Sequence, residues 1–155
     1  MAERFIDKAV EQTATYLTDN LPAKLRAVET ELGLTADSLT DPVAVVSHRV
    51  PFDNRSPLLE VFEEGWSWTA QANRMMAVDL TVAISDVSDA DIGAGEVFMR
   101  RYITALIDTF HADQTLGGTV TAAILTDGSS AVARGDSSAS RFVYTQGVEV
   151  RVNDA

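Results

Sequence analysis

Side chains that could carry acid–base or nucleophilic chemistry are few in this sequence and lie far apart. The two histidines, His48 and His111, have no His-x-x-x-His or carboxylate–His spacing that supports a metal site. A catalytic histidine also needs a positioned partner, whereas His111 is expected near the end of a helix, where its charge is tolerated. No serine lies in the Gly-x-Ser-x-Gly pattern of a nucleophile elbow. These residues predict no catalytic set, so the sequence favours a protein that is not an enzyme.

Carboxylates and thiols indicate no clearer site. Asp86, Asp89 and Asp91 form an acidic run that could ligate calcium, but the spacing lacks the rest of a calcium loop. Capping of a following helix explains Asp89 and Asp91 without a metal. The chain has no cysteine, which excludes disulfides, thiol catalysis and thiolate metal sites. We therefore expect neither a metal nor a cofactor.

Two tryptophans are the residues that an ordinary core explains least well. Trp66 and Trp68 are two positions apart and share one face of a strand, between flanks expected in solvent. Tryptophan is common both in cores and at interfaces, so both interpretations stay open. Small polar residues at 128–140 predict a mobile hairpin loop. On the interface interpretation this loop and the tryptophans contact other subunits, and Arg74 and Arg134 meet acidic surface there.

Hydrophobic periodicity predicts the elements that must position these residues. Helical spacing covers residues 4–20 and 22–33, with a proline at the junction, and predicts a helix pair or one kinked helix. Ser88 or Asp89 is expected to cap a long helix over residues 89–112. Five strands complete the order, at residues 42–50, 58–69, 76–85, 119–126 and 142–152.

The strand at 76–85 is the clearest element, because its apolar side chains alternate as in a sheet buried on one face. Short links between neighbouring strands favour antiparallel pairing. The predicted fold is one α+β domain over residues 1–155, a twisted antiparallel sheet of about five strands with one long helix on its buried face and an N-terminal helix pair. The core is expected to join the sheet to the long helix through Leu80, Val82, Ile84, Ile103, Leu106 and Phe110.

Length and charge narrow the class of protein further. At 155 residues the chain suits one domain with its own core. It carries 12 lysines and arginines against 23 aspartates and glutamates, a net charge of −11. That charge argues against a surface that binds duplex DNA or an anionic membrane. We also expect no signal peptide and no membrane span, since no apolar stretch approaches the length that either requires.

Five segments, in their order along the chain, carry a resemblance to a known family. They are Leu21–Val28, Leu39–Pro42 before the first strand, the alternating Val78–Ile84, an acidic helix cap followed by Arg100–Leu106, and Leu116–Gly118 before the final strands. Each segment alone is unspecific, but the ordered set spans nearly the whole chain. In this order the sequence resembles the tail-terminator, or tail-completion, proteins of long-tailed bacteriophages. It departs from the leaner members in its 128–140 loop and its 58–75 hairpin.

The resemblance implies a structural virion protein that assembles as a ring, usually a hexamer. Such a ring sits on the last ring of tail-tube protein, ends tube growth and joins the tail to the head through a connector or neck protein. It implies a place in the tail or neck of the virion, after assembly in the host cytoplasm. DNA would pass through the lumen without specific binding, which suits an acidic chain.

Other functions stay open on the sequence alone. Another phage neck or tail-tube component would have a similar composition, but a tube subunit polymerises indefinitely where a terminator stops at one ring. A non-viral α+β binding module could instead pair a strand with a partner. An enzyme of this fold class would need a concave pocket with convergent polar groups.

Overall fold

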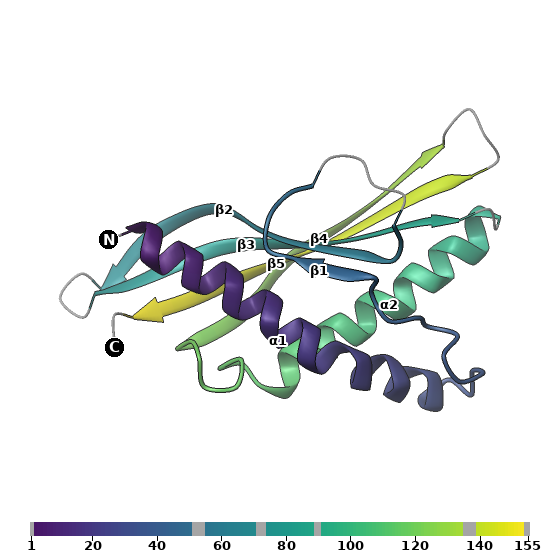
Figure 1. Ribbon diagram of the computed structural model, residues 1–155, viewed down its shortest axis with the longest axis horizontal. Coiled ribbons are helices and arrows are strands. Elements are labelled where there is room, and N and C mark those ends of the chain that lie inside the picture. Colours follow the sequence, from purple (N-terminus) through teal and green to yellow (C-terminus); the bar gives the residue numbers. More distant parts are fainter. Residues whose placement is uncertain (1, 51–54, 71–73, 89–90, 135–138, 154–155) are drawn as a thin grey trace.

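Residues 2–50, 55–70, 74–88, 91–134 and 139–153 are described by the computed structural model. They form an α+β fold with an N-terminal helix and a second long helix, which confirms the predicted class (Figure 1). The helices are α1 (Ala2–Glu31) and α2 (Ile92–Ala112), and the strands are β1 (Ala44–Val46), β2 (Leu58–Ala70), β3 (Met75–Ser88), β4 (Ala122–Arg134) and β5 (Ser140–Asn153).

The strands of the described residues form one mixed sheet in the order β1-β2-β3-β5-β4. From β2 to β4 every pairing is antiparallel, as predicted. β1 instead runs parallel to β2, so the prediction of an entirely antiparallel sheet is wrong at this edge. Residues 47–57 connect the two strands. A parallel pair needs such a long crossover, whereas a hairpin closes with a tight turn.

The N-terminal segment is one helix and not a pair, because α1 continues through Pro22. A proline inside a helix removes a backbone hydrogen bond and costs about 3 kcal/mol. An apolar stripe that crosses the proline offsets this cost, since Leu17, Leu21 and Leu25 are all fully buried. Burial of the same face before and after Pro22 therefore favours a continuous helix.

The core lies between β3 and the helices, where the alternation in the sequence predicts it. Leu80, Val82 and Ile84 are at most 2% exposed. They belong to one core with Leu106 and Phe110 of α2, which are also buried. The even-numbered face of β3 is therefore the helix side of the sheet.

The buried stripe of α2 is centred on a residue that periodicity alone does not single out. Tyr102 is fully buried, while Ile103 is partly buried and packs at the margin of the core. The Tyr102 hydroxyl donates to the Thr40 carbonyl oxygen at 3.0 Å, so its polar tip is satisfied inside the core. Burial raises the pKa of Tyr102. This hydrogen bond also holds the segment that leads into β1.

The start of α2 corrects the predicted cap. Asp91 is the N-cap, and its Oδ1 accepts a hydrogen bond from the Ala94 N–H at 2.8 Å. Ser88 ends β3 instead, and Asp89 lies outside the described residues. Asp91 therefore orders the first turn of the helix, the role that helix N-termini favour for aspartate.

Much of the predicted loop at 128–140 is strand. β4 continues to Arg134, and its second half, from Gly128, pairs with the first half of β5. Residues 135–138 lie outside the described part of the chain. The loop prediction is therefore wrong for the second half of β4. The strand was not recognisable in the sequence because Thr126–Ala133 are exposed. A strand buried on neither face has no apolar alternation to reveal it.

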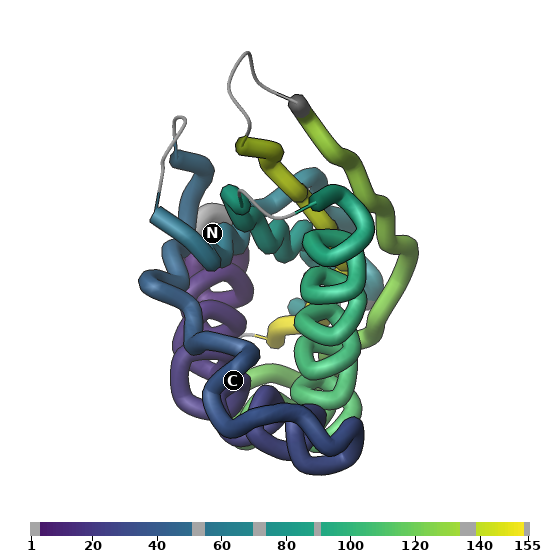
Figure 2. The backbone as a smooth tube through the Cα atoms, turned by 90° about the vertical axis from the view of Figure 1, so that its right-hand side faces the viewer, coloured from purple at the N-terminus to yellow at the C-terminus, as the bar shows by residue number. Residues whose placement is uncertain are grey.

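The molecule has two layers, with both helices on one face of the sheet (Figure 2). α1 packs on the β1–β2 side and α2 on the β5–β4 side. The single helix predicted on the buried face is thus joined by a second one. This arrangement leaves β1 and β4 as the two edges of the sheet, each beside a different helix.

Candidate interaction surface

Trp66 and Trp68 lie on the distal half of β2, where this strand runs past the end of β1. They pair with Val78 and Met76 of β3, so they lie on the helix side of the sheet. Their partners are fully buried, yet Trp66 is 53% exposed and Trp68 is 41% exposed. The structure therefore places the tryptophans at the rim of the core. Neither of the two interpretations drawn from the sequence describes this position fully.

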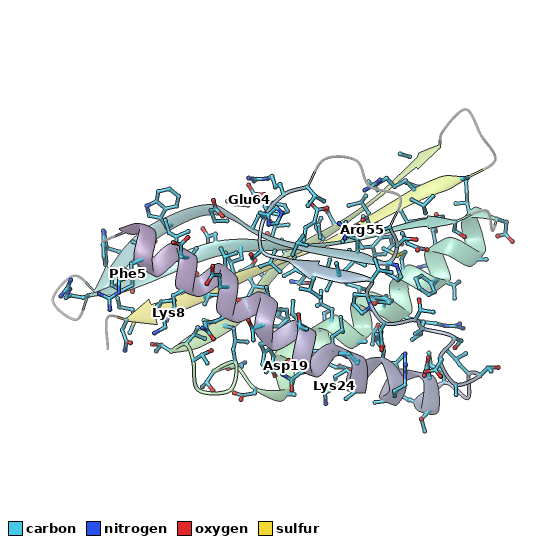
Figure 3. The ribbon with its side chains drawn as sticks, viewed as in Figure 1. Phe5, Lys8, Asp19, Lys24, Arg55 and Glu64 are labelled. Carbon is cyan, nitrogen blue, oxygen red and sulfur yellow. The ribbon has the colours of Figure 1, made fainter. Side chains whose placement is uncertain are left out.

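Trp68 is attached to the core through α1. Its ring meets the buried Phe5 ring edge-on, with centroids 5.4 Å apart and an interplanar angle of 79°. Figure 3 shows Phe5 beside the end of the sheet that β2 and β3 form. Edge-to-face pairs contribute about 0.5–1.5 kcal/mol beyond area burial. Trp68 is thus partly structural, while Trp66 presents the larger free surface.

The two arginines of the predicted contact set do not come together. Arg74 directly precedes β3, at the end of the sheet where β5 finishes, and its side chain is exposed. Arg134 pairs with Ser140, where β5 begins, and its side chain is not among those described. The arginines therefore lie at opposite ends of the sheet. Only Arg74 lies at the same end as the tryptophans.

A second candidate surface is the outer edge of β4, whose residues 128–134 were expected to form part of a mobile loop and are a strand instead. Within the described chain β4 pairs with β5 alone, so its other side presents unpaired backbone groups. Its residues Ser129–Ala133 carry neither a charge nor a proline. This uncharged run could have indicated an open strand edge, because edge strands usually carry charges or prolines that block pairing.

A cleft of about 440 Å³ opens between α1 and the turn that follows α2. Its most engaged group is Asp113, whose Oδ1 accepts from the Thr115 N–H and hydroxyl and whose Oδ2 accepts from the Gly117 N–H. These hydrogen bonds lower the pKa of Asp113. The Tyr16 hydroxyl donates to the Thr109 carbonyl oxygen at 2.8 Å, and burial raises the pKa of Tyr16. Both groups therefore serve the local structure.

The remaining candidates for chemistry stay apart. His48 follows β1 and His111 lies in the last turn of α2, and both are exposed. Among the described residues no three histidines and carboxylates cluster as metal ligands would. Asp86 is half-buried near the end of β3, and burial raises its pKa despite a hydrogen bond with Ser56. No described helix combines the length and apolar character needed to cross a bilayer.

No model of a known protein family matches the chain, and no curated protein matches it in sequence. The tail-terminator resemblance therefore stays a prediction based on the order of segments.

Proposed function

We propose that this chain is a structural subunit of a phage tail. Copies form a closed ring on the end of the tail tube, stop its growth and present the surface that joins the head. The resemblance suggests six copies. The protein contributes contact surfaces, and no reaction is part of the proposal.

The observation that carries the proposal is the exposed aromatic rim. Large aromatic side chains that are half exposed on a rigid strand are typical of binding anchors. Trp66 is held by the pairing of β2 with β3, and Trp68 by its contact with Phe5. Both are therefore positioned before any partner arrives, which lowers the ordering cost of binding. The outer edge of β4, which no other described strand pairs, supplies a second surface of the kind that subunit assembly covers.

The segments behind the resemblance also hold positions that suit a subunit scaffold. Val78–Ile84 lies in the middle of the sheet, Arg100–Leu106 lies in α2, and Leu116–Gly118 lies in the turn between α2 and β4. The backbone has positive φ at Leu116, Gly117 and Gly118, which explains why this turn is rich in glycine. The scaffold thus leaves its rim and edges free for contacts.

The test is to add the purified chain to tail-tube protein from the same phage while tubes grow. We expect short tubes that each end in one ring of this chain, at amounts far below those of the tube subunit. Immunogold labelling or cryo-electron microscopy locates the protein. The matched control is the variant with Trp66→Ala and Trp68→Ala, which should leave tubes long.

Two other outcomes would reject the proposal. Labelling along the whole tube would assign the chain to the tube itself. Tubes of unchanged length without bound protein would remove the terminator function altogether.

A further inference from the structure

The second half of β4, from Gly128 to Arg134, is an ordered strand edge that lies outside the core beneath the helices. We call this segment the overhang. Thr126–Ala133 are exposed, and Val132, on the helix side opposite Phe142, is 37% exposed. A β-bulge between Leu125 and Gly128 separates this overhang from the first half, where Ala123 is buried in the core. The overhang therefore adds almost nothing to the core, although it is a regular strand.

β5 keeps the overhang rigid. Phe142 is fully buried and packs so closely on Gly95 of α2 that a Cβ there would lie 2.2 Å from its ring. The residues that pair with Phe142 and its neighbours are those of the overhang. A strand held in place but unpaired on one side is ready to accept another strand, since its backbone is already ordered.

At the opposite edge of the sheet, the outer side of β1 could accept a further strand. β1 pairs only with β2 in the described chain, and its residues Ala44–Val46 carry no charge. Beside this edge a groove of about 290 Å³ runs between β1 and α1. Val45 lines it from the strand, and Ala14, Thr15 and Thr18 are among the residues that line it from the helix. Apart from Glu11, which also lines the groove, the lining side chains are small, and they fit small side chains such as Ser130 and Val132.

The rest of this side of the sheet is protected. Beyond Glu60, β2 has no outer neighbour in the described chain, but this stretch carries Glu63 and Glu64 and a β-bulge between Glu63 and Gly65. Charges and bulges are the usual devices that prevent edge pairing. β1 lacks them, which makes it the acceptor on this side.

We propose that the β4 overhang of one copy pairs with β1 of the next copy, with Val132 and Ser130 seated in the groove beside α1. This inference rests on the proposed ring and names its contact. Within one sheet β4 runs antiparallel to β1, so repetition of the subunit around an axis that runs roughly along the strands brings them together antiparallel. Such a head-to-tail contact can close into a ring, whereas a contact of β4 with itself gives only a two-fold dimer.

The test uses the alternation of side chains between the two faces of a strand. Ala131 of β4 and Val46 of β1 lie on the open face, whereas Ser130 lies on the helix side. The natural chain has no cysteine, so each introduced thiol can be followed alone. We expect the double variant Ala131→Cys with Val46→Cys, or its register neighbour with Ala44→Cys, to give a ladder of disulfide-linked oligomers on mild oxidation. The matched control, Ser130→Cys with Val46→Cys, should cross-link at least about tenfold more slowly, because its side chains point apart.

The single variants complete the design. Ala131→Cys alone and Val46→Cys alone should stay single chains, because each edge then lacks its partner thiol. A covalent dimer of Ala131→Cys alone would show that β4 pairs with itself, and it would overturn the inference. A ladder from neither same-face double variant, or equal rates for the control, would overturn it as well.

The tube assay separates this inference from the proposed function. If the natural chain caps tubes but the thiols never cross-link, the function stands and the β4–β1 contact is wrong. If the ladder forms but tubes are not capped, the contact stands and the terminator function is wrong. Circular dichroism of each variant checks that these exposed substitutions leave the fold intact.

Discussion

At the scale of single residues, the two tryptophans have separable roles. Trp68 touches the buried Phe5 ring, whereas Trp66 is 53% exposed. Their spacing in the sequence is the same as that of many core pairs, so only the position of α1 distinguishes them. Trp66 is the better reporter of binding.

We predict that Trp68→Ala lowers the free energy of unfolding by more than about 1 kcal/mol, because both the aromatic pair and the buried part of the ring are lost. Trp66→Ala should lower it by less, because a larger part of the Trp66 ring is already exposed. The double variant should stay folded but bind the tube or ring more weakly by about 2 kcal/mol or more. Urea denaturation and a binding titration measure the two effects. Unfolding of the double variant would mean that both rings belong to the core.

Asp86 provides a prediction of pH dependence. Burial raises its pKa, with hydrogen bonds to Ser56 and Val87 opposing the shift. A raised pKa means that the folded state prefers the protonated acid, so the ionised carboxylate destabilises the fold at neutral pH. We expect Asp86→Asn to raise the melting temperature at pH 7, and the gain to vanish as the pH falls below the ordinary aspartate range.

The control for Asp86 is Asp79→Asn, an exposed carboxylate on the same strand, which should leave the melting temperature nearly unchanged. A gain for Asp86→Asn that grows toward acid pH would have the wrong sign. That result would show that the carboxylate is stabilised as an anion and not penalised by burial.

At the scale of elements, β3 and α2 contribute their buried side chains to one shared core. Leu80 and Phe110 are at most 2% exposed and belong to the same core. We predict that Leu80→Ala or Phe110→Ala costs about 2–5 kcal/mol, because each leaves a cavity. That is a large share of the about 5–15 kcal/mol that holds a domain together. Chemical denaturation measures it, with the exposed Thr104→Ala as control. Unchanged midpoints for both core variants would contradict the assigned buried face.

The contact between α2 and β5 reverses an ordinary expectation for glycine. Replacing a helical glycine by alanine normally stabilises a helix by up to about 1 kcal/mol. At Gly95 the new Cβ would lie within 3 Å of three Phe142 ring atoms, so we predict that Gly95→Ala destabilises by about 1–3 kcal/mol. Adding Phe142→Leu should recover part of the loss. A more stable single variant would show that Phe142 moves aside freely.

At the scale of the whole molecule, charge sets which partners are possible. A chain with a net charge of −11 repels the phosphates of DNA. We predict no binding to a fluorescent DNA duplex at micromolar protein and near-physiological salt. The proposed ring requires this, because DNA would have to pass through its lumen without being held. A rise in anisotropy that weakens with added salt would reveal a basic surface and contradict the idea of an inert lumen.

The sequence by itself determined the parts of the fold in which one face is buried. The ten alternating residues around Leu80 predicted β3, and helical spacing predicted both α1 and α2, because burial on one side leaves a period that local sequence records. The absence of cysteine likewise follows from composition alone. The two tryptophans were recognisable as unusual from the sequence, because their flanks are charged and polar.

Tertiary structure alone decided the direction of β1, the length of β4 and the different roles of Trp66 and Trp68. Direction depends on where the crossover at 47–57 returns, which no local period encodes. The overhang of β4 is a strand because β5 supplies its hydrogen bonds, although neither of its faces is buried. Free edges are properties of what lies beside a strand, so they exist only once distant segments have met.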